Sequence, residues 1–213
     1  MSIKSLRKAP LAPAATVLMA GTAGAAQNKA VDELIAKIKD ESAKVRTEAW
    51  LSAGKVGAPA VKPLAKVMTN ENLEVARAAK RALWKIVRVA GRPGAEEEKK
   101  AVADELIPLL ANDQPTSVRR EVLWMLSEIG ERNSVRPIAR SMRNDALVED
   151  ARMALERIPG RRAVKALKAA FETVPEDFKP NIAQSLRNRG EEVAGYPCQK
   201  LVPTKKTNVE PLK

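Results

Sequence analysis

Cationic side chains and tryptophans recur at helical spacing along the middle of the sequence, and they are the residues best able to bind a partner. Guanidinium groups hold carboxylates and phosphates through paired hydrogen bonds, and tryptophan adds a large contact area. The predicted partner-binding residues are Arg77, Arg81, Trp84, Lys85, Arg88, Arg120, Trp124, Met153 and Arg157. Trp50 lies one position off an apolar stripe, so we expect it in the core rather than at this surface.

Catalytic designs are strongly limited by two absences in the sequence. There is no histidine, and Cys198 is the single cysteine. An intrachain disulfide, a histidine-based metal site, a Ser-His-Asp triad and a Cys-His dyad are therefore all excluded. We predict no catalytic residue, no metal and no cofactor, and we favour a binding protein while leaving an enzyme open. Cys198 either bridges to another chain or is an unpaired residue of the C-terminal segment.

The charge of the chain points to acidic partners without choosing among them. The formal net charge is +12 and the isoelectric point is about 10.0. Nucleic acid, an anionic membrane and an acidic protein surface all suit such a chain, and a basic surface that only keeps the protein soluble is the plain alternative. Acidic residues such as Glu48, Glu121 and Asp150 fall among the predicted binding residues. This mixture favours a protein partner, with nucleic acid kept as the alternative.

An internal repeat supplies the elements that must position these residues. Apolar or small residues follow an anchor after four, seven or eight, and eleven positions, which places one stripe on a helix of about 14 residues. The anchors are Val45, Val75, Val118, Leu147 and Phe178, so the period is about 30 residues with one insertion of about 13. A second apolar helix precedes each anchor. We therefore predict an all-α fold, an α-solenoid of about five helical hairpins.

The repeats define the predicted domain organisation. They occupy residues of about 29–57, 58–90, 95–130, 132–160 and 161–190, within a repeat domain over 27–192 and before a basic, irregular tail over 193–213. Four of the second helices are expected to end at a glycine in a left-handed cap: Gly57, Gly130, Gly160 and Gly190. Prolines at 63, 108 and 137 fall within first helices and are expected to bend them.

Two segments of the repeat carry a family resemblance. Lys44-Val45-Arg46 to Gly57 and Ser117 to Gly130 resemble HEAT repeats, and the length is similar to the short HEAT-like repeats of phycobilisome lyases. The resemblance covers about 29–191. It implies that the second helices line a concave binding face, and that Arg46 and Arg119 pair with Asp40 and Asp113.

The resemblance leaves several functions open because HEAT arrays serve many roles. The favoured hypothesis is an exported protein-binding scaffold or adaptor that uses the concave face. The first alternative is a nucleic-acid binder or a HEAT-like DNA-repair glycosylase, with Trp84, Trp124 and Asp150 in the cleft. The second is an assembly or maturation factor, lyase-like, of a pigment or redox complex. Deoxyhypusine hydroxylase is excluded because it needs histidine ligands.

The first 26 residues resemble a secretory signal peptide. Lys4, Arg7 and Lys8 precede a short apolar stretch, and small residues up to Ala25 and Ala26 offer a cleavage site. The stretch is too short to span a membrane. We predict a periplasmic or secreted protein, with a transit peptide to an organelle or a disordered tail on a cytoplasmic protein as alternatives. The sequence leaves the oligomeric state open.

Overall fold

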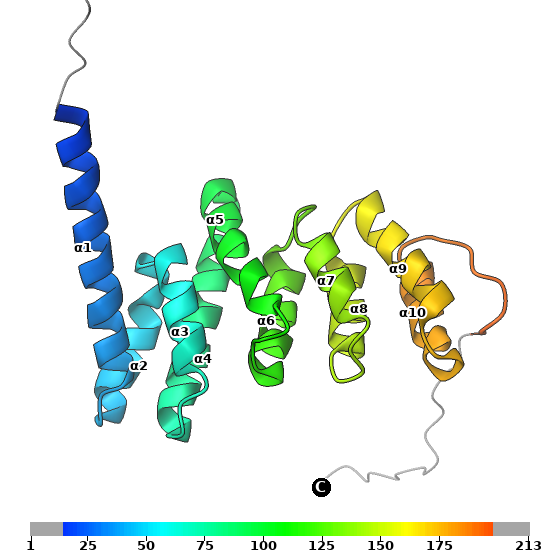
Figure 1. The fold of residues 1–213 in the computed structure, drawn as a ribbon, viewed down its shortest axis with the longest axis horizontal. Helices are drawn as coiled ribbons and strands as arrows, with labels where there is room; N and C mark the ends of the chain where they lie inside the picture. The colour runs from blue at the N-terminus through cyan, green and yellow to red at the C-terminus, as the bar shows by residue number, and fades with distance from the viewer. Residues whose placement is uncertain (1–14, 198–213) are drawn as a thin grey trace, which may run out of the picture. The chain divides into compact units, whose positions relative to one another are not determined.

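The fold is helical throughout the part of the chain that the structure describes. The computed structural model describes the backbone of residues 15–197 and the side chains from residue 24 onward. Within that range the regular elements are α-helices and short 3-10 helices, with no strand. Within each of its two compact units the helices alternate between two layers (Figure 1). The predicted fold class, an all-α solenoid of helical hairpins, is therefore confirmed.

The chain divides into two compact units at Leu109 and Leu110. This division falls inside the third predicted repeat, within the short 3-10 helix η3 (Ile107–Leu110) that follows α5 (Glu96–Leu106). Unit 1 therefore ends just after α5, and unit 2 begins just before α6 (Thr116–Ile129). Each unit has its own core.

Unit 1 is a two-layer stack of helices. Its α-helices are α1 (Ala15–Ile38), α2 (Ala43–Ser52), α3 (Val61–Val67), α4 (Leu73–Ala90) and α5, with 3-10 helices η1 (Ala53–Lys55) and η2 (Ala58–Ala60) between α2 and α3. In one layer α3 contacts both α1 and α5, and in the other α2 contacts α4. The second layer presents the predicted binding residues of this unit.

Helix α4 shows why the sequence folds in this way. The side chain of Asn72 caps its start by accepting hydrogen bonds from the backbone N–H groups of Glu74 (3.0 Å) and Val75 (3.4 Å). Its buried residues recur at intervals of three and four and are Val75, Ala78, Ala79, Ala82, Leu83, Ile86, Val87 and Ala90. Several of them are alanines, which lets α2 and α3 pack close to the α4 backbone. The opposite side of the helix is left for long cationic side chains.

Unit 2 repeats the two-layer arrangement. It contains α6, α7 (Val135–Ser141), α8 (Val148–Arg157), α9 (Arg161–Thr173), the 3-10 helix η4 (Glu176–Phe178) and α10 (Lys179–Asn188). In one layer α8 contacts both α6 and α10, and in the other α7 contacts α9. The sides of these helices that face one another form a core of aliphatic side chains.

The predicted apolar stripes are confirmed as the lining of the cores. The fully buried members are Ala49, Ala53, Val75, Ala79, Leu83, Ile86, Val118, Val122, Leu126, Ile129, Leu147, Ala151, Leu155, Ile158, Ile182 and Leu186. The first and last anchors, Val45 and Phe178, are only half-buried. They belong to the terminal hairpins, where a neighbouring hairpin covers one side of the core only.

The left-handed cap expected at Gly130 is wrong, and the bends expected at the prolines stay a prediction. Pro108 lies in η3, after α5 has ended. Pro63 and Pro137 are the third residues of α3 and α7, where a backbone N–H has no partner within the helix, so they cause no bend by removing one. Gly57, Gly160 and Gly190 do have positive φ angles, but Gly130 has φ of −67°. Gly130 is required for space, since a Cβ there would lie 2.3 Å from the backbone oxygen of Leu126.

The implied arginine–aspartate ladder does not form as ion pairs. The Arg46 guanidinium donates to the backbone oxygens of Asp40 and Glu41, both at 2.8 Å. The Asp40 carboxylate instead accepts from the backbone N–H of Ser42 at 2.8 Å. Arg119 is 5% exposed, and its Nε has no hydrogen-bond partner among the described residues. Arg46 therefore stabilises a turn through carbonyl groups.

A polar network ties α8 to α10 in unit 2. Arg152 contacts the carboxylates of Glu149 and Glu156, and Glu156 also accepts from Ser185 Oγ (2.7 Å) and Asn188 Nδ2 (2.8 Å). Burial acts to raise the pKa of Glu156, but the hydrogen bonds from Ser185 and Asn188 and the charge of Arg152 together hold that pKa below its ordinary value. Glu156 is therefore held as an anion between the two helices.

The described start of the C-terminal segment packs on unit 2. Arg187 Nη2 donates to the backbone oxygens of Val193 (3.2 Å) and Gly195 (2.7 Å). The Tyr196 ring meets Phe171 edge-on with centroids 5.4 Å apart, and its hydroxyl donates to Glu176. Residues 193–197 have no helix, as expected of an irregular tail. Their contacts with unit 2 were not part of that prediction. Cys198 and the residues after it lie outside the described part.

At the other end, α1 begins at Ala15 and runs through the predicted cleavage position without a break. Residues 1–14 of the signal-like segment lie outside the described residues. Among the helices of the described chain, none combines the length and the apolar character that crossing a membrane requires.

Candidate functional site

The predicted binding residues fall on three helices in the two units. Arg77, Arg81, Trp84, Lys85 and Arg88 lie on α4 of unit 1. Arg120 and Trp124 lie on α6, and Met153 and Arg157 on α8, all in unit 2. The two groups form different kinds of site.

In unit 1 the five predicted residues line one groove. Its volume is about 480 Å³, and its lining residues are Trp50, Arg77, Lys80, Arg81, Trp84, Lys85 and Arg88. The α4 members follow one another at spacings of three and four, which keeps them on one side of the helix. Trp50 comes from α2 and forms the wall that α4 does not supply. We name this the cationic groove.

Five of the seven lining residues of the cationic groove are cations, and none is an acid. The Arg81 guanidinium carbon lies 5.9 Å from the centre of the Trp50 ring, and that of Arg88 lies 5.6 Å from the Trp84 ring. Cation–π contact of this kind orients a guanidinium without neutralising it. Arg77 forms an ion pair with Glu74 at 2.7 Å, so its charge is already balanced.

Three cations of the groove keep their full charge available. Arg81, Lys85 and Arg88 form no ion pair with any carboxylate of the described chain. Bringing several cations together without carboxylates costs electrostatic energy, which an anionic partner would recover. The groove can therefore bind anionic groups in an oriented way, and its lining has no carboxylate, histidine or cysteine.

Trp50 and Lys80 are members of the groove that the sequence analysis missed. Trp50 was expected in the core, yet it is half-buried with its ring against Arg81. Its indole Nε1 is buried and has no hydrogen-bond acceptor among the described residues.

In unit 2 three of the four predicted residues bind carboxylates on the facing helix. Arg120 Nε and Trp124 Nε1 both donate to the Asp150 carboxylate, at 3.0 and 2.9 Å. Arg157 forms an ion pair with Glu128 at 2.9 Å. These contacts join α6 to α8 and neutralise the cations that make them.

Trp124 and Met153 differ in how much of their side chains is exposed. Trp124 is 38% exposed despite its hydrogen bond, whereas Met153 is half-buried. A partner-binding role for the four residues of unit 2 stays a prediction. Both oxygens of Asp150 accept hydrogen bonds, so this carboxylate serves first to hold α6 and α8 together.

Metal binding has no candidate in the described part of the chain. No group of three or more histidine, cysteine, aspartate or glutamate residues comes together there in a way that could hold an ion. Many acidic residues form ion pairs with nearby arginines and lysines, such as Glu98 with Arg92 and Asp104 with Lys100.

Comparison with known proteins finds similar chains among solved structures. No protein-family model matches the sequence, and no curated protein matches it. Among solved structures, the chain is similar to a designed armadillo repeat protein in complex with the peptide (KR)4, at 18% identity and a TM-score of 0.43, covering 73% of this chain and 80% of that one. It is also similar to an engineered protein at 20% identity and a TM-score of 0.39, with coverages of 74% and 78%.

Proposed function

We propose that this chain is a non-catalytic binding protein and that its cationic groove takes an acidic segment of a protein partner. One observation carries the proposal: five cations and two tryptophans line a groove of about 480 Å³ that has no acidic residue in its lining. Burial of this positive surface by a partner is favourable only if the partner supplies negative charge.

Carboxylates fit the groove better than nucleic-acid bases do. Arg81 and Arg88 already lie over the rings of Trp50 and Trp84. Single-stranded nucleic acid is held largely by stacking bases on free aromatic faces, and these faces are partly covered. A guanidinium that lies on an indole still presents its N–H edge, which matches the two oxygens of a carboxylate.

Peptide binding with charge-reversed variants tests this proposal. The probe is a fluorescently labelled peptide of glutamates, and the variant is Arg81→Glu with Arg88→Glu. The matched control is Arg136→Glu with Arg140→Glu on α7 of unit 2, which changes the net charge equally. We expect the groove variant to weaken binding by more than about tenfold, or about 1.4 kcal/mol, and the control to change it little. Equal loss in both variants, or no binding by the unaltered protein, overturns the proposal.

Unit 2 supports a second candidate function, binding of nucleic acid. Seven exposed cations on and beside α7 and α9 form no ion pair with the described residues: Arg132, Arg136, Arg140, Arg143, Arg161, Arg162 and Lys165. Helices α7 and α9 contact each other, so the two stripes belong to one layer. Such a surface would track a phosphate backbone with little dependence on sequence.

Duplex DNA distinguishes this candidate from the first. Binding should weaken steeply as the salt concentration rises, because phosphate contacts release counterions. The Arg136→Glu, Arg140→Glu variant should lose most of the binding, and the Arg81→Glu, Arg88→Glu variant should keep it. Absence of binding at low salt rejects the candidate.

The repeat type and the destination of the chain complete the proposal. We propose that the hairpins are of the short HEAT-like type, supported by the Val-Arg pairs at the starts of α2 and α6 and by the period of about 30 residues. We also propose export, supported by the sequence of residues 1–26. Intact-mass measurement of the native protein tests it: removal of the first 25 or 26 residues is expected, and retention of Met1 overturns export.

A further inference from the structure

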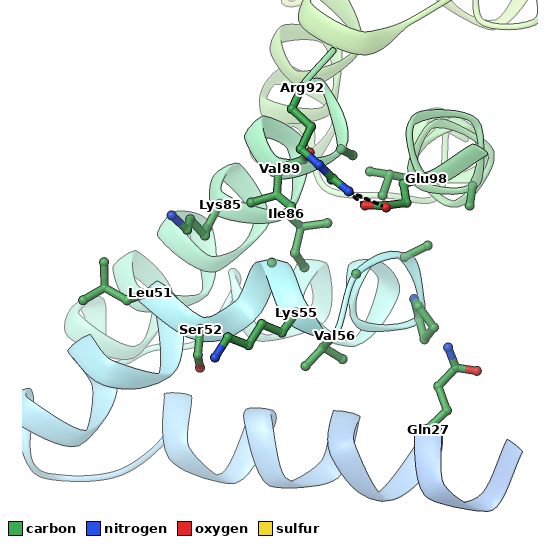
Figure 2. A pocket seen from close by; sticks show the side chains of 17 residues that line it. Gln27, Leu51, Ser52, Lys55, Val56, Lys85, Ile86, Val89, Arg92 and Glu98 are labelled. Atoms are coloured by element: carbon green, nitrogen blue, oxygen red, sulfur yellow. Dashed lines mark hydrogen bonds and ion pairs between the residues drawn. The ribbon is translucent and has the colours of Figure 1, made fainter. Parts of the chain in front are cut away.

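A second pocket in unit 1 adjoins the cationic groove. Its volume is about 710 Å³, and it is bounded by α1, α4, α5 and the segment from Leu51 to Pro59 (Figure 2). Lys85 lines both this pocket and the cationic groove, so the two hollows meet on α4. A partner that follows α4 from Arg81 towards its C-terminal end therefore passes from one into the other.

The wall of the second pocket is mainly apolar. Leu51, Val56, Ile86, Val89 and Val102 contribute side chains to it. Leu51 is 48% exposed, although leucine gains most when it is buried. An open pocket with such a wall is suited to an aliphatic side chain of a partner. We name it the apolar pocket.

Gly54 lets η1 approach α4 closely at this wall. A Cβ at position 54 would lie 2.7 Å from Val89 Cγ2, so a side chain there would displace Val89. The close approach of η1 to α4 thus depends on glycine. This close approach sets the position of the Val89 side chain in the apolar pocket.

Charge is distributed unevenly around the apolar pocket. Arg92 donates to both oxygens of Glu98, at 2.6 Å each, which neutralises this side (Figure 2). Lys55 and Lys85 have no ion pair with the described residues. The pocket is thus positive on the side where it meets the cationic groove and neutral where Arg92 and Glu98 pair.

We infer that the partner segment is an acidic peptide with one aliphatic residue beside its carboxylates, the carboxylates meeting the cationic groove and the aliphatic side chain entering the apolar pocket. This inference rests on the proposed function. Arg81 and Val89 are eight residues apart on α4, or about 12 Å along the helix. An extended peptide covers that distance in about four residues. The aliphatic residue should therefore lie about four residues from the carboxylates along the peptide, which we take to run parallel to α4.

Other occupants fit the pair of hollows less well. A nucleic acid has a charged backbone and no aliphatic group that would fill the apolar pocket. The chain's own residues 198–213 contain four lysines and one glutamate, so their charge repels the groove. An acidic peptide with an aliphatic residue matches both the charge and the apolar surface.

Two labelled peptides test the inference with the full-length protein. The first has glutamates followed by glycine and serine, and the second differs by one leucine placed about four residues after the first glutamate. We expect the leucine peptide to bind about five- to tenfold more tightly, as partial burial of one aliphatic side chain in an open pocket predicts. Equal affinity for the two peptides overturns the inference and leaves the proposed function standing. Failure of both peptides to bind overturns the proposed function.

Substitutions in the apolar pocket test whether the leucine of the peptide binds there. Ala101 is exposed and lines the apolar pocket, so Ala101→Trp should fill it without disturbing the core. Ala169→Trp, at an exposed position of α9, is the matched control. We expect Ala101→Trp and Leu51→Ser each to abolish the preference for the leucine peptide, while the glutamate peptide still binds. A preference that survives both variants overturns the assignment of the leucine to the apolar pocket.

Discussion

Replacement of Arg189 by leucine should destabilise unit 2 although leucine would continue an apolar stripe. The Arg189 guanidinium donates to the backbone oxygens of Glu156 (2.8 Å) and Ile158, and Nη2 lies 3.3 Å from the oxygen of Gly160. The last carbonyl groups of an α-helix have no partner within the helix. Arg189 supplies donors to such carbonyls at the end of α8 and to the turn before α9.

The size of the effect follows from the hydrogen bonds that are lost. A bond to a charged donor contributes about 1.5–3 kcal/mol, and Arg189 makes two short ones. The two are not independent, and leucine recovers some apolar burial. We expect Arg189→Leu to lower the free energy of unfolding by about 2–4 kcal/mol. Arg189→Lys keeps the charge but reaches fewer carbonyls, so it should lose about half as much.

Urea unfolding followed by far-ultraviolet circular dichroism measures this loss. Arg161→Leu is the control, because Arg161 is exposed and forms no ion pair with the described residues. The control should change the free energy of unfolding by less than about 0.5 kcal/mol. If Arg189→Leu changes it as little as Arg161→Leu does, the carbonyl contacts do not stabilise the protein and the reasoning is refuted.

Three further predictions address single features of the fold. The lowered pKa of Glu156 means that its contribution is present above the ordinary value of 4.5 and is lost as the pH falls below it, so Glu156→Gln should flatten the decline in melting temperature between about pH 5 and pH 3. A decline as steep as in the unaltered protein would contradict this. Trp50→Phe removes an N–H without an acceptor, and Trp124→Phe removes a 2.9 Å hydrogen bond worth about 0.5–1.5 kcal/mol. In urea unfolding, Trp50→Phe should therefore lower the free energy of unfolding less than Trp124→Phe does. The reverse order would count against this reasoning. Gly130→Ala places a Cβ against a backbone oxygen and should lower the melting temperature more than Gly57→Ala, which has open space but φ of 71°; an equal effect would disprove the steric account.

The helices and their buried sides could be predicted from the sequence because they depend on local periodicity. Val118, Val122, Leu126 and Ile129 recur with the helical period, and all four are buried. The cations of α4 could be placed together for the same reason, since residues three and four apart share a side of a helix. Neither conclusion requires the distance between two helices.

The contacts that leave some cations charged and neutralise others depend on the distance between neighbouring helices. Arg120, Trp124 and Arg157 share a pattern with Arg81 and Arg88 in the sequence, yet the first three are tied to Asp150 and Glu128. Arg81 and Arg88 instead lie over tryptophan rings and keep their charge. Periodicity decides which side of a helix a residue occupies, whereas only the packing of neighbouring helices decides which carboxylate, carbonyl or ring comes within reach of it. That is why the sequence predicted the position of the cationic groove, and the tertiary structure was needed to find Trp50 in its wall and the apolar pocket beside it.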